Sequence, residues 1–401
     1  MQRTAGLACS AQFSSREDAE GACARQDGGV QSHEHSHHTH PASESQRSAA
    51  DEVERRYQRF AEREAPGRSA LYGEWAAGVA SGPLVQGVLA RIAATHRQPP
   101  LVFAVARLLG APLEPWPVMR EWMLLHADAL VAACAERSLQ TNEPLRCAVL
   151  LPALALIEGP IALLEVGASA GLCLFPDHYS YRYRDASGAV VSIDPEEVDA
   201  ASGGASGASV AATAPVVLDC ELRGPVPPLR VPEIVWRAGI DLQPLDASDD
   251  GDRAWLTGLV WPGEQGRTER VTRALDIVAR EAPAGVPLVR QGDAVEMLAA
   301  LAAEAPAGAT LVITTPGVLA HVPWAGRMRI IETAQALPGH WITLDDPGLH
   351  QAWHPPIDAA DWPEGGFALA LDGEVLAAAD PLGGWLAWRR SAGGGALTLE
   401  A

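Results

Sequence analysis

The spacing of apolar residues divides the chain into two parts. In the first part, apolar residues recur every three to four positions, as on the buried face of a helix. Residues 51–62 show this spacing, and Gly and Pro separate further segments that share it, at 83–96, 100–109, 122–139 and 143–157. The pattern predicts a helical N-terminal domain over residues 51–158.

In the second part, short apolar runs alternate with helical patterns. This alternation is typical of β-α-β units and predicts a mostly parallel sheet. The expected strands are 162–166, 234–242, 287–291, 310–314 and 340–344, with helices at 252–259, 269–281, 294–304 and 324–336. Three runs joined by turns predict an antiparallel hairpin that closes one sheet edge, at 367–371, 375–378 and 385–388. Residues 159–401 are therefore expected to form an α/β domain.

Two segments depart from these patterns. About seventy residues separate the first two expected strands, where a whole β-α-β unit needs only about 30. We explain this by an insertion at about 175–232, with a β-ribbon over 179–194 and a flexible loop at 201–213. Residues 1–50 are rich in Ser, Ala, Gln and Gly, which predicts a disordered tail. We interpret its HEHSHHTH tract as a polar segment and predict no metal site, because no rigid scaffold holds these histidines.

Charge and apolar run length limit the partners of the protein. The formal net charge of the 401 residues is −20, which disfavours nonspecific binding to nucleic acids and to anionic membranes. The most apolar run is too short to cross a bilayer, and the N-terminus shows no secretory signal. We therefore expect a cytoplasmic protein that binds a small molecule rather than nucleic acid or membrane. The sequence leaves the oligomeric state open.

Two residue types exclude further classes of chemistry. All 30 basic residues are arginine, so the chain has no lysine for a Schiff base or for a phosphate-binding P-loop. The six cysteines show no CxxC spacing, which argues against a zinc ribbon or a disulfide scaffold. We expect them to be reduced thiols that serve mostly in packing.

The most informative segment is LLEVGASAGL, residues 163–172. An apolar run containing Glu165 is followed by the small residues Gly167, Ser169 and Gly171. Glycines permit tight turns and close backbone approach, so the segment predicts a buried strand that turns into a helix. The N–H groups at the start of such a helix can bind a ligand. The same pattern also serves as a packing device between a strand and a helix.

The order of the acidic residue and the glycines resembles the nucleotide loop of S-adenosylmethionine-dependent methyltransferases, with Ser169 at the middle glycine. Five ordered segments resemble the bacterial family called domain of unknown function 2332. They are QTNEPLRCAVLLPAL, LLEVGASAGL, RAGIDLQPLD, WLTGLVWP and DPLGGWLAW. The resemblance covers about Val53 to Trp388 and implies a methyltransferase-like, Rossmann-type fold. It implies S-adenosylmethionine as the ligand class, but no particular reaction.

Three positions depart from the pattern of that family. Cys173 stands where Asn is expected, and Thr315 and Leu382 stand where His is expected. If those histidines carry chemistry in relatives, this chain has lost or altered it.

The resemblance implies roles for three acidic residues, each with a structural alternative. Glu165 would lie near the methionine amine of the cofactor, or would cap the N–H groups of the loop. Asp241 would accept both ribose hydroxyls, or would cap a turn, in which case Asp246 replaces it. Asp293 would bind the adenine amine, or would cap a helix. The expected cofactor-binding set is completed by the loop residues Gly167, Ser169 and Gly171.

The polar residues 140–143 precede an apolar helix. They either cap that helix, through Thr141 or Asn142, or contact the site from the helical domain. His321 and Asp346 lie near strand ends, but the sequence identifies no catalytic residue.

The leading hypothesis is a methyltransferase-like protein that binds S-adenosylmethionine and has an unknown acceptor. The alternative is a non-catalytic binding or regulatory module on the same fold, which Ser169, Thr315 and Leu382 favour. A third reading, NAD(P)-linked redox chemistry, is disfavoured by the acidic residue before the loop and by the antiparallel end of the sheet.

Overall fold

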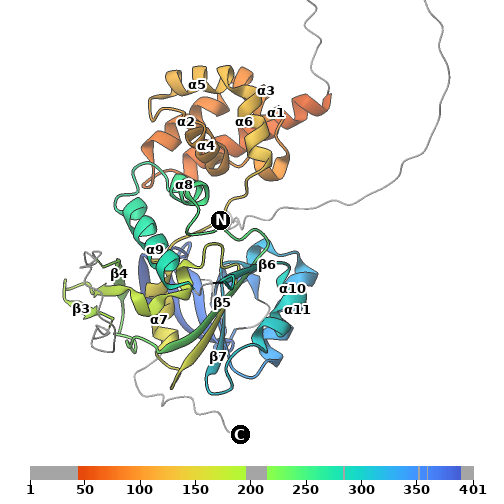
Figure 1. Cartoon of the computed structure of the whole chain (residues 1–401). Helices are drawn as coiled ribbons and strands as arrows, with labels where there is room; N and C mark the ends of the chain where they lie inside the picture. Colours follow the sequence, from red (N-terminus) through yellow and green to blue (C-terminus); the bar gives the residue numbers. More distant parts are fainter. Residues whose placement is uncertain (1–43, 196–214, 283–284, 351–352, 359, 390–401) are drawn as a thin grey trace, which may run out of the picture. The chain divides into compact units, whose positions relative to one another are not determined.

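One sheet of eleven strands carries the α/β part of the chain (Figure 1). The computed structural model describes residues 44–195, 215–282, 285–350, 353–358 and 360–389. The predicted flexible loop and residues 1–43 of the predicted tail lie outside this range. In the described residues, no helix combines the length and the apolar character that a membrane crossing needs.

Five parallel strands form the core of the sheet, in the order β6-β5-β1-β7-β8. They are β1 (Ile161–Val166), β5 (Ile234–Asp241), β6 (Val289–Gln291), β7 (Thr310–Pro316) and β8 (His340–Asp345). The prediction of a parallel core is confirmed. The chain starts in the middle, moves to one edge and then crosses back, so the switch point lies between β1 and β7. Every residue of β1 is buried, because helices cover both faces of such a sheet.

The C-terminal antiparallel strands are confirmed, but they do not close a sheet edge. They are β9 (Phe367–Leu371), β10 (Glu374–Ala379) and β11 (Trp385–Trp388). β9 pairs with β8, and β11 pairs with a strand of the insertion. The prediction that this hairpin ends the sheet is therefore wrong, because the insertion extends the sheet beyond it.

The insertion contributes three strands, β2 (Ser180–Arg184), β3 (Val190–Ile193) and β4 (Val217–Arg223). β2 and β3 form the predicted antiparallel ribbon. β4 was not predicted, and it joins the ribbon to the rest of the sheet by parallel pairing with both β2 and β11. Its exposed and buried residues alternate strictly, with Leu218, Cys220 and Leu222 on the buried side. This period of two is visible in the sequence VLDCELR and was the signal for the strand.

The first part of the chain is helical, as predicted, but its first helix begins at Glu44, so the prediction of a disordered tail is wrong for residues 44–50. Its α-helices are α1 (Glu44–Arg59), α2 (Ala70–Ala80), α3 (Pro83–Leu89), α4 (Pro99–Leu108), α5 (Trp116–Leu125), α6 (Ala127–Ala135) and α7 (Arg146–Leu154), and a π-turn, Phe60–Glu64, follows α1. The predicted helix 122–139 is wrong, because α5 ends at Leu125 and α6 begins at Ala127, with His126 between them. α2 was missed because its apolar residues point in all directions, so it has no distinct polar face.

Residues from the second part of the chain complete the core of the helical part. α8 (Asp250–Gly258) contributes Trp255, and Trp261 follows it; both pack in the same apolar cluster as α1 to α6. Arg107 of α4 donates hydrogen bonds to the carbonyls of Gly258 and Val260, at 3.0 and 2.7 Å. The helical part therefore depends on residues beyond 158 for its packing.

The remaining helices cover the two faces of the parallel core (Figure 1). α9 (Arg267–Glu281) lies on the same side as α7, and both share one apolar cluster with Leu163 of β1 and Val312 of β7. α10 (Ala294–Ala302) and α11 (Trp324–Ala336) cover the opposite face. Alternate residues of β1 therefore point into two different apolar layers, and Glu165 points toward the layer of α7 and α9.

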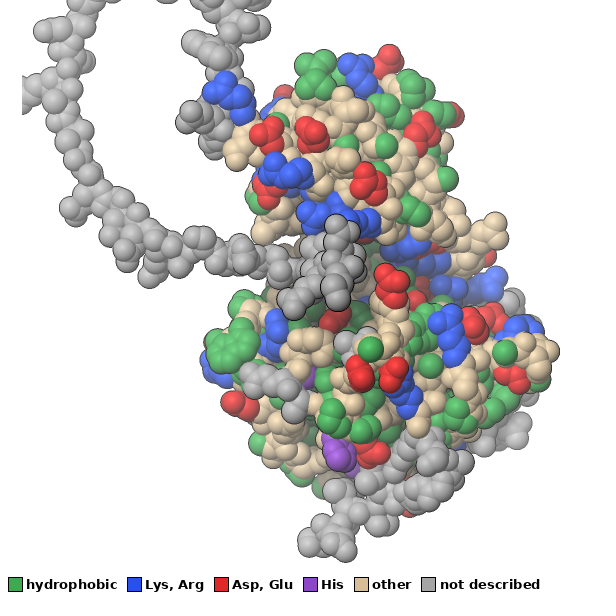
Figure 2. Space-filling view, turned by 180° about the vertical axis from the view of Figure 1, so that it is seen from behind, with side chains coloured by type: hydrophobic (Ala, Val, Ile, Leu, Met, Phe, Trp, Pro, Cys, Tyr) green, Lys and Arg blue, Asp and Glu red, His purple; other side chains and the backbone are tan. Residues whose placement is uncertain are grey.

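Charges of both signs share the described surface. On the face in Figure 2, acidic and basic side chains lie interspersed and apolar patches are small and scattered. The described residues on this face do not form one continuous basic surface.

We expect Gly383→Ala to destabilise the fold, because Gly383 has a φ of 94° and a Cβ there would overlap the main-chain carbonyl of Leu145. Strain of this kind costs about 1–3 kcal/mol, and the displaced backbone adds to it. The measurement is the free energy of unfolding in denaturant. Gly384→Ala is the matched control, because its Cβ would meet the nearest atom only at 3.8 Å. Equal stability of the two variants would show that a Cβ at position 383 does not overlap the Leu145 carbonyl.

Candidate functional site

The candidate site lies where β1, β5 and β7 end, at the switch point of the sheet. The loop after β1 has left-handed conformations at Gly167, Ser169 and Gly171, with φ of 78°, 53° and 78°. A left-handed serine is uncommon and stores strain. The loop therefore turns as tightly as its sequence predicts.

The helix expected after this loop is absent. Two short 3₁₀ turns follow instead, Leu172–Leu174 and Pro176–His178. Pro176 explains the difference, because a proline disfavours helical conformation in the residue before it and removes a backbone donor. No α-helix begins at this loop, so the predicted ligand site on a helix N-terminus is wrong in that respect.

The backbone amides of the loop all have partners within the protein. Ser169 N–H donates to Asp241 Oδ2 at 2.8 Å, and Ala170 N–H donates to Asn142 Oδ1 at 3.3 Å. The amides of Gly167, Ala168 and Gly171 donate to main-chain carbonyls. In addition, a Cβ on Gly167 would lie 2.5 Å from Val318 Cγ2. The protein itself therefore occupies the space directly against Gly167.

The polar segment before α7 contacts the loop. Asn142 Nδ2 donates to Ser169 Oγ at 2.7 Å, and Ser169 Oγ donates to Gln140 Oε1. α7 begins at Arg146 without a side-chain cap at its N-cap residue, Leu145. The capping interpretation of Thr141 and Asn142 is therefore wrong, and Asn142 serves to hold the loop in its strained conformation.

Glu143 is an anchor between this segment and α9. Its carboxylate is almost fully buried and forms ion pairs with Arg267, at 2.6 Å, and Arg270, at 2.9 Å. A buried charge needs such compensation. These ion pairs fix the start of α7 against the helix that covers the same face of the sheet.

Two of the predicted acidic ligands have structural hydrogen bonds. Asp241 Oδ1 accepts from Gln243 N–H at 2.8 Å, and its Oδ2 accepts from Ser169. Asp293 caps α10, since its Oδ1 accepts from Val295 N–H at 2.8 Å. The capping alternatives therefore describe both residues. Each carboxylate keeps further lone pairs for a ligand.

Glu165 differs from the other predicted residues. Its side chain is 4% exposed, and its Oε2 has no hydrogen-bond partner. The predicted capping of loop amides is not observed, because those amides donate elsewhere. Burial raises the pKa of Glu165 well above its usual value, and the neighbouring Cys173 adds to the rise, while Arg146 opposes it. A buried polar atom without a partner is rare and calls for an explanation.

Arg146 is the basic residue of the site. Its Nε donates to the Pro381 carbonyl at 2.8 Å and its Nη1 to the Pro316 carbonyl at 3.1 Å. Both side chains lie in the part of the chain that the structure describes, and no ion pair within 4.0 Å joins the Arg146 guanidinium to the Glu165 carboxylate. Burial, with the charge of Arg146, lowers the pKa of His321, which lies after β7. The sequence contained a signal for Arg146, because it is the one charged residue in the apolar run 144–157.

The other residues singled out in the sequence have structural contacts. Thr315 is fully buried and its Oγ1 accepts from Trp341 Nε1 at 3.0 Å. Asp346 caps a 3₁₀ turn, and Asp246 Oδ1 accepts from Ser248 N–H. The described residues contain no group of three or more His, Cys, Asp or Glu side chains that could hold a metal ion.

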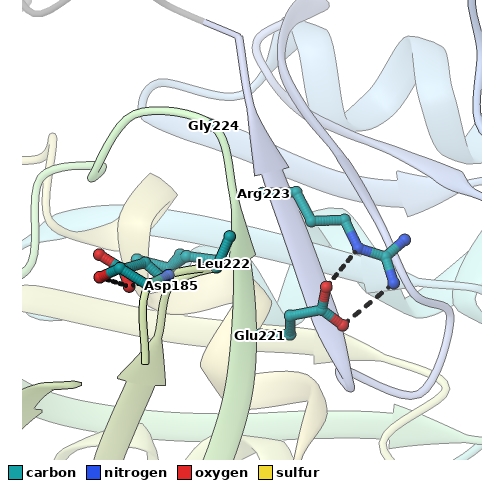
Figure 3. Close-up of a pocket in the computed structure, with 7 residues that line it drawn as sticks. Asp185, Glu221, Leu222, Arg223 and Gly224 are labelled. Atoms are coloured by element: carbon teal, nitrogen blue, oxygen red, sulfur yellow. Dashed lines mark hydrogen bonds and ion pairs between the residues drawn. The ribbon is translucent and has the colours of Figure 1, made fainter. Parts of the chain in front are cut away.

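A pocket of about 420 Å³ lies away from these residues, where β2 and β4 end (Figure 3). Its polar groups are paired with one another: Arg223 forms an ion pair with Glu221, and Asp185 accepts from Ser187. We assign no role to this pocket, because it contains none of the predicted site residues and its charged groups already have partners.

The family model described as "Uncharacterized protein conserved in bacteria (DUF2332)" matches residues 109–388. The chain belongs to this family. The DUF2332 match contains all eleven strands, the loop after β1, Glu165 and Arg146, and it begins just after α4. The family resemblance expected from the five segments is thus confirmed over residues 109–388, whereas it was expected to begin at about Val53. No curated protein and no solved structure matches the chain.

The stability of the protein should depend on pH through Glu165. Because the folded state raises the pKa of Glu165, it holds the proton more tightly than the unfolded state. The free energy of unfolding therefore falls as pH rises above the ordinary value of 4.5, until the folded pKa is passed. Glu165→Gln cannot ionise, so we expect this variant to gain stability relative to wild type as pH increases above that value.

Denaturant unfolding of both proteins at a series of pH values from acidic to neutral tests this expectation. Glu296→Gln is the control, because it makes the same substitution at an exposed side chain. If the difference in unfolding free energy between Glu165→Gln and wild type stayed constant with pH, Glu165 would ionise equally in the folded and unfolded states.

Proposed function

We propose that the protein binds S-adenosylmethionine where β1, β5 and β7 end, and that its fold is a methyltransferase-like variant of the Rossmann type. One observation carries this proposal: the buried Glu165 carboxylate has an oxygen without a partner at the switch point of the parallel sheet. Ligands of open α/β sheets lie at this position. The antiparallel strand beside β8 favours the methyltransferase type over a dinucleotide-binding sheet.

The charges at the site match the amino-acid end of this cofactor. S-Adenosylmethionine carries an ammonium group and a carboxylate on the same carbon. Glu165, which is buried, and Arg146, which is half-buried, offer the two opposite charges, and no ion pair joins the two side chains. The ammonium group would donate to Glu165, and the carboxylate would accept from the Arg146 guanidinium. Charge-assisted hydrogen bonds of this kind are the strongest that a protein forms.

The adenosine end would lie toward β5. Asp241 keeps lone pairs for the ribose hydroxyls, although both of its oxygens accept from backbone amides. Binding at this end requires Val318 to move away from Gly167. Methyl transfer needs mainly an acceptor held in line with the sulfonium. We assign no catalytic residue for that step.

A second candidate is a binding module without catalysis on the same fold. The closed loop favours it, because all five loop amides donate to protein acceptors and Val318 covers Gly167. Labelled methyl transfer across a panel of acceptors separates the two: cofactor binding without any turnover would favour the binding module.

Isothermal titration calorimetry should detect binding of S-adenosylmethionine and S-adenosylhomocysteine, and no binding of NAD. Glu165→Gln should weaken both interactions by roughly 10- to 100-fold, since a hydrogen bond to a charged group contributes about 1.5–3 kcal/mol. Glu296→Gln, on the exposed side of α10, should bind like wild type. Absence of heat with both ligands at high micromolar concentration would reject the proposal.

Asp241→Ala should weaken cofactor binding by about 1–3 kcal/mol if its carboxylate holds the ribose. Asp246→Ala is the comparison, and its affinity should not change. Thermal stability must be recorded alongside, because Asp241 also accepts from Ser169 in the loop. Unchanged affinity in Asp241→Ala together with a loss in Asp246→Ala would assign the ribose to Asp246.

A further inference from the structure

We propose that Cys173 is a peroxide-reactive thiol and that Cys147 is its resolving partner, so that a hydroperoxide converts the two cysteines into a disulfide. From the sequence we expected both cysteines to serve in packing, because 26 positions separate them and no spacing motif connects them. The fold brings them together beside Glu165 and Arg146.

The two thiols occupy one site. Cys147 is in the first turn of α7, and Cys173 is in the 3₁₀ turn after the loop. Cys147 Sγ lies 3.9 Å from the main-chain oxygen of Cys173. Cys173 Sγ lies 3.7 Å from the main-chain oxygen of Glu143, close to the start of the same helix. Each side chain therefore contacts the segment that carries the other thiol.

The surroundings favour the thiolate of Cys173. Direct hydrogen bonding from Cys147 lowers the pKa of Cys173, and the positive charge of Arg146 lowers it further, against the effects of burial and Glu143. The charge of Glu143 is compensated by Arg267 and Arg270. A thiolate, not a thiol, is the nucleophile toward peroxide. The Arg146 guanidinium therefore favours the reactive thiolate form of Cys173, and the fold places Cys147 next to it.

The two cysteines differ in access. Cys173 is partly exposed, whereas Cys147 is fully buried. A small peroxide thus reaches Cys173 first, and Cys147 is placed to react with the product. The described chain also provides an internal comparison: burial raises the pKa of Cys134 and of Cys220 to about 12, so these thiols stay protonated and unreactive.

The chemistry balances with hydrogen peroxide as the oxidant. The Cys173 thiolate attacks one peroxide oxygen, the O–O bond breaks, and a sulfenic acid forms with release of hydroxide, which takes up a proton to give water. The Cys147 sulfur then attacks the Cys173 sulfur, and the hydroxyl group leaves as water with the Cys147 proton. Two thiols and one peroxide give one disulfide and two waters.

The test uses the full chain, reduced and then freed of reductant. It is treated with hydrogen peroxide, unfolded in an alkylating agent and digested after arginine. Both cysteines then lie on one peptide, residues 147–182, because no arginine lies between them before Arg182. We expect this peptide to lose both alkylation sites and two hydrogen atoms. The peptides of Cys134 and Cys220 should oxidise at least about ten-fold more slowly.

Two variants assign the roles of the thiols. Cys147→Ser should accumulate a sulfenic acid at Cys173 that dimedone traps. Cys173→Ser should leave Cys147 reduced, and Cys134→Ser should behave like wild type. Circular dichroism before treatment confirms that each variant is folded. Full alkylation of both cysteines after peroxide, or oxidation of Cys147 at the wild-type rate in Cys173→Ser, would overturn the proposal. None of these outcomes depends on S-adenosylmethionine binding.

Discussion

The parallel pairing of β1 with β5 on one side and with β7 on the other determines where the rest of the α/β part must lie. Once β1 is in the middle of the sheet, the chain has to leave it by a turn, return to one side through β5 and cross to the other through β7. The carboxyl ends of three strands then meet at one place. Backbone groups that would be free in an isolated strand have to find partners there.

Those partners come from segments far apart in the sequence. Asp241 and Asn142 supply acceptors for loop amides whose own conformation is strained. The hydrogen bonds offset the strain, and the polar residues before α7 become part of the loop's support. In this network of paired groups, Glu165 stands out because one of its oxygens has no partner.

The insertion changes what lies on that face of the sheet. In a simple β-α-β unit, a helix would follow β1 and cover it. Here two short 3₁₀ turns follow the loop, the second of them beginning at Pro176, and the chain continues into β2. α7 and α9 cover this part of the sheet instead. The exchange places Arg146 and Cys147, from before β1, against Cys173, from after the loop, so that one site combines a carboxylate, a guanidinium and two thiols.

Much of the fold was predictable from local patterns. The parallel core strands, the C-terminal hairpin, the ribbon and most helices follow from periods of two and of 3.6 residues, because these periods reflect which side of an element is buried. The same reasoning missed α2, whose apolar residues leave no distinct polar face, and it missed β4 although a period of two is visible in the sequence. The residue types at the candidate site, above all Glu165 and the small residues after it, were also recognisable.

The tertiary structure alone decided how these residues meet. Whether Asp241 is free or holds the loop, whether Asn142 caps a helix or supports Ser169, and whether two distant cysteines touch all depend on contacts between residues dozens of positions apart. Sequence spacing describes neighbours on one helix or strand. It contains no information on strand order or register, and these set every long-range distance in the protein.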